Sequence, residues 1–202
     1  MRLKPLKTND PKLRQVSQEI SQKELKDKNL QLLIETFLDY VFQNNFKDKG
    51  QKRRNAPSTV GLSANQVGIL RRISIVDLAI GKRHFNDIHS LINPEITWRS
   101  KTLIERCEGC VNLPQVFGLI KRSKRVKVKA YDRSGNLLML DLGGWPAVLL
   151  QHEIDHLNGF LFIDHLRDPK RAHKVLDSEV KDYRKKYKNW DKFIDVSQWV
   201  RK

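Results

Sequence analysis

The chain has 202 residues, which is enough for one well-buried domain and too few for two ordinary ones. Its 39 Lys and Arg against 23 Asp and Glu give a formal net charge of +16 at pH 7, which fits either an acidic partner, such as RNA or a ribosome surface, or a basic solvated exterior. The absence of about 18 continuous apolar residues and of a signal-peptide core excludes a membrane span and favours a cytoplasmic protein.

Helical patterns come first along the chain. Asp10 and Pro11 open a short amphipathic segment that continues to Ile20. Apolar residues at helical spacing then predict one buried helix face within residues 30–42, formed by Leu30, Leu33, Ile34, Phe37, Leu38, Val41 and Phe42. Residues 47–57 carry a run of charges with Gly and Pro, which predicts an exposed loop.

Short β-strands follow from residue 72 onward. Polar and apolar residues alternate most clearly in residues 126–131, which predicts a half-buried strand paired with residues 137–142 through the turn between them. We expect antiparallel sheets, because no alternation of strands with helices occurs in this part of the chain. The other strands are predicted at residues 73–76, 91–98, 102–106 and 116–120.

Two helices are predicted after the strands. Pro146 suits the first turn of one and Gly159 suits its stop, and the residues between them are apolar nearly all round, so this helix belongs in a core. Asp168 and Pro169 resemble the N-cap and first turn of another, amphipathic helix that runs to Tyr187. The sequence predicts one α+β domain over residues 1–202, with a core at residues 1–166 and a basic C-terminal helical extension at residues 167–202.

The first of these helices carries the pattern His-Glu-Ile-Asp-His at residues 152–156. His152 and His156 are four residues apart, so both imidazoles lie on one helical face and can reach a single divalent metal. Glu153 lies one step round the helix, where it can deprotonate a water held by the metal without being a ligand. Chance spacing is the alternative, but burying these polar groups is costly unless a metal or hydrogen bonds satisfy them. The pattern therefore favours a metal-dependent hydrolase.

A hydrolytic site of this kind needs a third protein ligand and an open position for water. A metzincin would have a histidine at position 162, where this chain has Phe162, so that interpretation fails. Glu179 would serve as the glutamate of a gluzincin, but it sits among charges typical of a solvated face. A cysteine remains, and the Cys107 and Cys110 pair is more typical of a metal or redox site than of a disulfide in a reducing compartment.

Three motifs around these residues resemble those of peptide deformylases. Residues 108–114, Glu-Gly-Cys-Val-Asn-Leu-Pro, resemble the family's E-G-C-L-S-x-P, and residues 151–159 match its Q-H-E-x-D-H-L-x-G throughout. Residues 59–66, Thr-Val-Gly-Leu-Ser-Ala-Asn-Gln, approximate G-x-G-L-A-A-x-Q. The motifs follow the family's order up to about Leu166, which implies a peptide-deformylase-like fold with antiparallel sheets packed around the central helix, N-terminal helices and a C-terminal helix.

The resemblance implies an enzyme that removes the formyl group from N-terminal formylmethionine of nascent polypeptides and releases formate. Its metal ligands would be Cys110, His152 and His156. They would hold one divalent ion per chain, characteristically Fe(II), with Zn(II) or Ni(II) as substitutes.

The other site residues are also implied by the resemblance. Glu153 would carry a proton from water to the leaving amine. The side-chain amide of Gln66 and the backbone N–H of Val111 would stabilise the oxyanion, and Gly61 would permit a tight backbone approach beside the substrate. Positions that match the family's pocket for the methionine side chain are Val60, Val148 and Leu149.

Several positions depart from the family pattern. The changes within motifs are modest: Thr59 replaces a glycine, Ser63 an alanine, and Val111-Asn112 a leucine-serine pair. Arg106, Phe117 and Trp145 lie near the expected substrate pocket and affect substrate specificity more than metal binding. They leave open a deformylase-like protein with an altered substrate, or one that binds a peptide or the ribosome without turnover.

Three further expectations concern neighbouring residues. Cys107 with the three ligands could form a closed, structural Cys₂His₂ zinc site that leaves no room for water. Asp155 is expected to support the site through a buried ion pair with Arg122. The remaining histidines, His84, His89, His165 and His173, are expected on the surface or in loops.

The expected partners are formylmethionyl peptides and, by analogy with family members that dock through a C-terminal helix, ribosomal RNA. Positive charges cluster in residues 47–54, in residues 121–129 and in the C-terminal region. We expect a monomer without a membrane partner.

Overall fold

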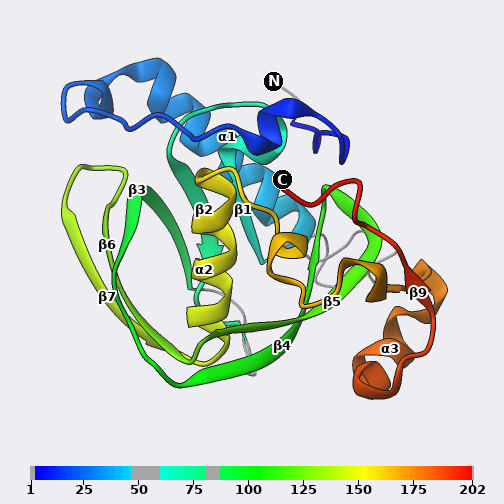
Figure 1. The fold of residues 1–202 in the computed structure, drawn as a ribbon. Helices are drawn as coiled ribbons and strands as arrows, with labels where there is room; N and C mark the ends of the chain where they lie inside the picture. Colours follow the sequence, from blue (N-terminus) through cyan, green and yellow to red (C-terminus); the bar gives the residue numbers. More distant parts are fainter. Residues whose placement is uncertain (1–2, 47–59, 81–86, 202) are drawn as a thin grey trace.

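The computed structural model describes residues 3–46, 60–80 and 87–201. The predicted loop at residues 47–57, Thr59 and His84 lie outside the described residues. Within them, two antiparallel sheets flank a central helix, α2 (Trp145–Leu157), which has strands of one sheet on one side and β4 (Leu103–Cys110) and β5 (Leu113–Ser123) on the other (Figure 1). The predicted α+β arrangement around this helix is confirmed.

The larger sheet has five strands in the order β1-β2-β3-β6-β7, and every neighbouring pair is antiparallel. The predicted pairing of residues 126–131 with residues 137–142 is confirmed, because β6 and β7 pair in register from Arg125↔Gly143 to Tyr131↔Leu137. The strands are β1 (Gly61–Ser63), β2 (Ile73–Asp77), β3 (Ile88–Arg99), β6 (Arg125–Tyr131) and β7 (Leu137–Gly143).

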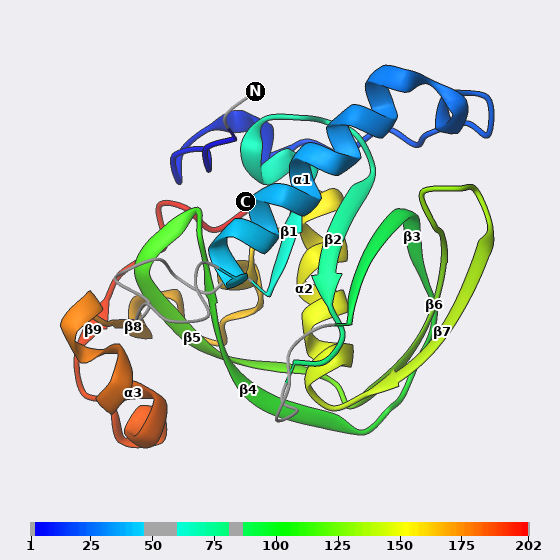
Figure 2. The same cartoon turned by 180° about the vertical axis from the view of Figure 1, so that it is seen from behind.

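The two faces of this sheet bury different clusters. Successive side chains of a strand point to opposite faces, so Ile75 packs with α1 (Lys28–Phe46) while Val76 packs with α2. Figure 2 shows α1 on the side of β1 and β2 away from α2. The sheet therefore covers one side of the central helix, and α1 covers the other face of that sheet. The two layers shield this side of α2 from water.

Helix α1 agrees with the predicted apolar face. Leu30, Ile34, Phe37 and Val41 recur at helical spacing and are buried. The carboxylate of Asp27 accepts a hydrogen bond from the backbone N–H of Asn29 at 2.7 Å, as an N-cap residue does. The amphipathic segment that precedes this helix contains only a short 3-10 turn, Pro11–Arg14.

Helix α2 begins and ends as its sequence predicts. Pro146 occupies the first turn, where its missing N–H costs nothing. Gly159 follows the helix with φ of +76°, and a Cβ at this position would lie 2.4 Å from the backbone oxygen of Arg14. Only glycine fits both the backbone angle and this close approach, so the end of the helix is fixed against the N-terminal segment.

The smaller sheet has four strands in the order β4-β5-β8-β9, completed by β8 (Ala172–Lys174) and β9 (Phe193–Ile194). The helix predicted from Asp168 is wrong in extent. Pro169–Arg171 forms only a 3-10 turn, and α3 (Val180–Lys186) is the single α-helix of the described residues 167–201. Pairing of His173 with Phe117 and with Phe193 outweighs the local helical periodicity.

In the part of the chain that the structure describes, no helix combines the length and apolar character needed to cross a membrane.

Candidate metal centre

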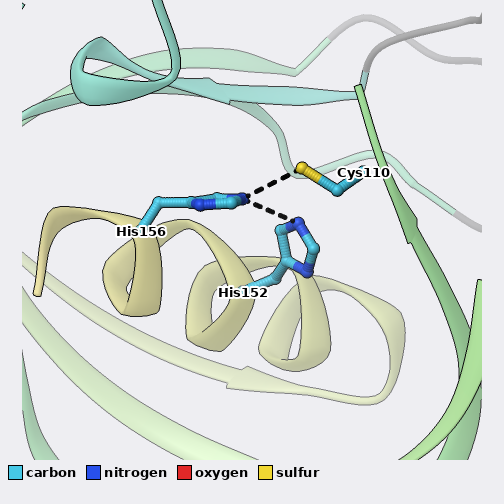
Figure 3. A group of neighbouring side chains, drawn as sticks. All are labelled: Cys110, His152 and His156. Carbon is cyan, nitrogen blue, oxygen red and sulfur yellow. Dashed lines mark hydrogen bonds between the residues drawn. The ribbon is translucent and has the colours of Figure 1, made fainter. Parts of the chain in front are cut away.

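The side chains of Cys110, His152 and His156 converge between α2 and the end of β4 (Figure 3). The two Nε2 atoms of the histidines are 3.2 Å apart, and Sγ of Cys110 lies 3.4 Å from Nε2 of His156. All three candidate ligand atoms lie within 4.8 Å of one another. His156 is fully buried and His152 is 9% exposed, so the cluster lies inside the protein.

The two separations at His156 fit a tetrahedral metal site. Metal–nitrogen distances of about 2.0–2.1 Å and a metal–sulfur distance of about 2.3 Å put two tetrahedral nitrogens about 3.3 Å apart, and nitrogen and sulfur about 3.6 Å apart. The observed separations of 3.2 Å and 3.4 Å are close to these values. Two imidazoles and a thiolate leave one coordination position open, so the donor set fits a divalent cation that also binds water or substrate.

The two cysteines of the chain take different places on β4. Cys107 stands in the regular ladder opposite Leu119, and its Sγ donates to the hydroxyl of Tyr183 at 3.0 Å. The register with β5 then shifts between Gly109 and Cys110, and such an irregularity re-aims a side chain. Because Cys107 contacts Tyr183, it does not join the cluster, and the closed Cys₂His₂ arrangement is not formed.

Glu108 orients one of the histidines. Its Oε2 lies 2.9 Å from Nδ1 of His152, which directs Nε2 of the same ring into the cluster. Burial opposes a charge on His152, but hydrogen bonds with Cys110 and Glu108 outweigh it and raise the pKa of this imidazole well above its ordinary value. Burial and the neighbouring His152 lower the pKa of His156 well below its ordinary value. The cluster therefore accommodates a positive charge, which a proton or a metal cation can supply.

A buried network of ion pairs holds Glu108, the residue that contacts His152, in place. Arg122 donates to both carboxylate oxygens of Glu108, at 2.5 Å and 2.9 Å, and to Asp155 at 2.6 Å. Burial opposes ionisation of both carboxylates, but Arg122 and their histidine partners outweigh it, so each pKa falls to about 2. The predicted ion pair between Asp155 and Arg122 is confirmed, and it ties β4, β5 and α2 together.

Glu153 is 2% exposed and lies against β1. Burial raises its pKa, while the charge of His152 and a hydrogen bond from Ser63 act in the opposite direction. A Cβ at Gly61 would lie 2.5 Å from Oε1 of Glu153, so any side chain there would collide with the carboxylate. The glycine thus makes room for Glu153, a more specific reason than the one expected from sequence.

Gln66 lies beside the cluster and is held on several sides. Its Nε2 donates to Sγ of Cys110 at 3.3 Å and to Oδ1 of Asn112 at 3.1 Å. Its Oε1 accepts from the backbone N–H of Ser63 at 2.7 Å. Val111 occupies the turn that joins β4 to β5, next to Cys110. The structure therefore brings all seven predicted site residues into one neighbourhood.

The three departures near the expected pocket fall into two groups. The guanidinium of Arg106 lies 5.6 Å from the ring centroid of Trp145, which is 38% exposed at the start of α2. The ring of Phe117 packs against Tyr183 with centroids 5.1 Å apart and covers Gly109, the residue before Cys110. Of the expected pocket residues, Val148 and Leu149 are buried on α2, and Val60 packs against the same cluster as Leu149.

The remaining histidines do not all lie where the sequence predicts. His165 is exposed, as expected, but it pairs with Asp155 at 2.8 Å. His89 is half-buried on β3. The expectation for His173 is wrong, since it is 7% exposed on β8 and its Nδ1 lies 2.8 Å from the hydroxyl of Tyr183.

Sequence reasoning missed three supporting residues. Glu108 stands in a quoted motif, yet its contact with His152 depends on chain segments 44 residues apart. Ser63 and Asn112 look like minor substitutions within motifs, but both are buried and hydrogen-bond to predicted site residues. For Ser63 and Asn112, the sequence signal that could have identified them was a polar side chain larger than the residue in the family motif.

Comparison with known proteins gives a consistent result. The family model for polypeptide deformylase matches residues 3–172. A peptide deformylase from Cellvibrio japonicus (strain Ueda107) is 34% identical over 163 residues, which cover 81% of this chain and 85% of that protein. One from Brachyspira hyodysenteriae is 34% identical over 181 residues, covering 87% of this chain and 85% of that protein.

A solved structure extends the similarity to nearly the whole chain. The peptide deformylase from Synechococcus elongatus in complex with actinonin superposes with a TM-score of 0.70 at 28% identity, covering 98% of this chain and 90% of that one. The match of the family model over most of the chain establishes membership: the chain belongs to the polypeptide deformylase family.

Proposed function

We propose that this chain removes the formyl group from N-terminal formylmethionine of nascent polypeptides and releases formate. Peptide deformylases are metal-dependent hydrolases that act on this linear amide. The observation that carries the proposal is the convergence of one sulfur and two imidazole nitrogens within 4.8 Å, beside the buried Glu153.

In the proposed site, Cys110, His152 and His156 hold one divalent cation per chain, Fe(II) in the native protein, with Zn(II) or Ni(II) able to replace it. Such a cation supplies Lewis acidity, which activates water and polarises a carbonyl group. Glu108 keeps the ring of His152 in its ligand orientation through their 2.9 Å contact.

Glu153 is the proposed proton carrier. Its carboxylate takes a proton from the attacking water and gives it to the nitrogen of the leaving amine, so that formate and a free amino terminus result. Its burial and raised pKa suit a group that must both accept and donate a proton near neutral pH.

The oxyanion that develops on the formyl oxygen needs hydrogen-bond donors. We assign this role to the side-chain amide of Gln66 and the backbone N–H of Val111. The amide of Gln66 lies 3.3 Å from Sγ of Cys110, a proposed metal ligand, and this proximity supports the assignment. Gly61 contributes by leaving space for Glu153.

Formate release from a formyl-Met peptide tests this function. The Fe(II)- or Ni(II)-loaded wild type should release formate, and Glu153→Ala should lower kcat by about 10²- to 10⁴-fold, the usual contribution of general acid–base catalysis. Glu105→Ala is a matched control, because Glu105 is exposed on β4 and should leave the rate unchanged. A loaded wild type without turnover would contradict the proposal and favour a deformylase-like protein with another substrate or a binding role, which the comparisons do not favour.

We also propose that the protein is a cytoplasmic monomer that contacts ribosomal RNA through its basic surface. The net charge of +16 and the exposed basic residues of α3, Arg184, Lys185 and Lys186, support this partner. Binding to ribosomes should weaken with salt and with Lys185→Glu and Lys186→Glu together. An absence of co-sedimentation even at low salt would contradict the proposal.

A further inference from the structure

Ser63 lies at the end of β1, directly against Glu153. Its Oγ is 2.7 Å from Oε2 of Glu153, and the serine is fully buried. The same Oγ is 2.7 Å from Oγ of Ser74, which is also fully buried. Ser74 faces Ser63 in the register of β1 with β2, so antiparallel pairing fixes the two hydroxyl groups side by side.

When Glu153 is ionised, as it must be to take a proton from water, counting protons fixes the direction of these hydrogen bonds. An ionised carboxylate only accepts hydrogen bonds, and a serine hydroxyl has a single proton to donate. The backbone oxygen of Glu153 also lies within reach of Ser63, at 2.9 Å, but the ionised carboxylate is the stronger acceptor. Ser63 therefore donates to Oε2 of Glu153 and accepts from Ser74, which gives a short chain of two hydroxyl groups that ends on the carboxylate.

The two carboxylate oxygens of Glu153 consequently differ. Oε2 is tied to Ser63, whereas no hydrogen bond reaches Oε1 from the residues that the structure describes. Oε1 faces Gly61, where even a Cβ would come within 2.5 Å. Oε2 is thus hydrogen-bonded to the sheet, whereas Oε1 occupies the space that the missing side chain of Gly61 leaves.

We propose that Ser63 is a positioning residue for Glu153: its hydroxyl, backed by Ser74, anchors Oε2 so that Oε1 carries the proton from water to the leaving amine. This inference rests on the proposed function. The family motif quoted above has alanine at position 63, so this hydroxyl is not among the residues that the resemblance assigns to the reaction. A carboxylate held in one orientation loses less freedom at the moment of proton transfer than one that rotates.

The first test compares Ser63→Ala with the wild type in formate release by the Ni(II)-loaded enzyme. Alanine fits sterically because it is smaller and stands in the family's motif at this position. The proposal requires kcat to fall about tenfold, which corresponds to the loss of one hydrogen bond to a charged group, while KM changes less than about twofold. Metal content per chain should be unchanged.

Two variants separate positioning from packing. Ser63→Thr keeps the hydroxyl and should bring kcat back to within about threefold of wild type. Ser17→Ala is a matched control: Ser17 is a buried serine whose hydroxyl has no hydrogen-bond partner among the described residues, and its removal should change neither kcat nor KM. If threonine does not fit, as a lowered unfolding midpoint would reveal, Ser74→Ala takes its place and should lower kcat less than Ser63→Ala does.

A double-mutant cycle separates this inference from the function on which it rests. In the Glu153→Ala background, Ser63→Ala should cause no further loss of kcat, and the unfolding free energies of the four proteins should be non-additive. The inference would be overturned if the kcat of Ser63→Ala stayed within about twofold of the wild-type value. It would also be overturned if the fall in kcat were accounted for by a fall in metal content. A wild type that releases no formate would overturn the proposed function, while the unfolding cycle would still measure the contact between Ser63 and Glu153.

Discussion

Strand β4 meets two regions of opposite character within three residues. At Cys110 it reaches the candidate metal centre, where Glu108 contacts His152 and pairs with Arg122, which also pairs with Asp155. At Cys107 it reaches α3, part of the C-terminal region at residues 167–201; α3 lies at the edge of the molecule away from α2 (Figures 1 and 2). There the contact is a neutral one, because burial raises the pKa of the Cys107 thiol to about 11 and the thiol donates to Tyr183.

The difference shows how each region is stabilised. The candidate metal centre contains charged groups that are costly to bury alone. Removal of one of them leaves its partner buried without a compensating charge. The C-terminal region packs aromatic rings, with Tyr183 5.1 Å from both Phe117 and Trp190. Its buried tyrosine adds hydrogen bonds with Cys107 and His173, and the ion pair of Lys192 with Glu179 lies near the surface. We therefore expect substitutions at the metal centre to have large, coupled effects, and those in the C-terminal region to have small, local ones.

Arg122→Met should have the largest effect on stability. It leaves Glu108 and Asp155 buried without their cation, which should lower the unfolding free energy by about 3–5 kcal/mol in urea denaturation. Arg125→Met is the matched control, because its ion pair with Asp141 is exposed and contributes less than about 1 kcal/mol. Equal losses in the two variants would show that burial of the network does not matter.

Acidic pH should have the second-largest effect, and it should act on the same ion network. The pKa values of Glu108 and Asp155 fall from 4.5 and 3.8 to about 2 in the folded protein. Because folding lowers them, their contribution is complete above about pH 4.5 and is lost as the pH falls towards 2, on the order of 2–3 kcal/mol each. Unfolding free energies of the metal-free protein between pH 6 and 2 should show this loss, and Arg122→Met should show much less of it. Parallel pH curves for the two proteins would contradict the assignment.

Asn112→Ala should have an intermediate effect, of about 1–3 kcal/mol on stability, since the amide of Asn112 donates to the backbone oxygens of Leu6 and Gln66 at 2.9 Å. It should also lower kcat, because Gln66 loses the partner that holds its side chain. Gln31→Ala is the control, since this amide also donates to two backbone oxygens but lies on α1. A similar fall in kcat in both variants would mean that the effect is one of general stability.

Tyr183→Phe should have the smallest effect. It removes the hydroxyl that joins Cys107 and His173 but keeps the ring, so we expect a loss of about 1 kcal/mol with unchanged metal content and kcat. Tyr187→Phe, on the same segment, should change stability less. Loss of metal in Tyr183→Phe would show that the two regions are coupled through β4, and the contrast between them would fail.

The sequence predicted the metal centre far better than the C-terminal region, for a physical reason. Spacing within one helix converts directly into geometry, so His152 and His156 could be placed on one face of α2 from their numbers alone. Cys110 could be added only through the motif around it, because its position depends on an irregularity in β4. Partners that arrive from distant strands, such as Ser63 on β1, could not be assigned.

In the C-terminal region, local pattern and tertiary pairing disagree. Asp168 and Pro169 do form a cap and first turn, as predicted, but the turn stops at Arg171. The chain then pairs with β5, and the buried His173 finds Tyr183 as a partner. A strand of three residues has too little sequence to reveal itself, so the periodicity of a helix was the stronger local signal.

In the proposed site, Cys110 and not Cys107 completes the metal centre. Metal content per chain should be measured with formate release on the same samples of wild type, Cys110→Ser and Cys107→Ser. Wild type and Cys107→Ser should each hold about one ion and release formate, whereas Cys110→Ser should lose both properties. A Cys107→Ser protein without metal, or a Cys110→Ser protein that keeps its metal and its turnover, would contradict the account.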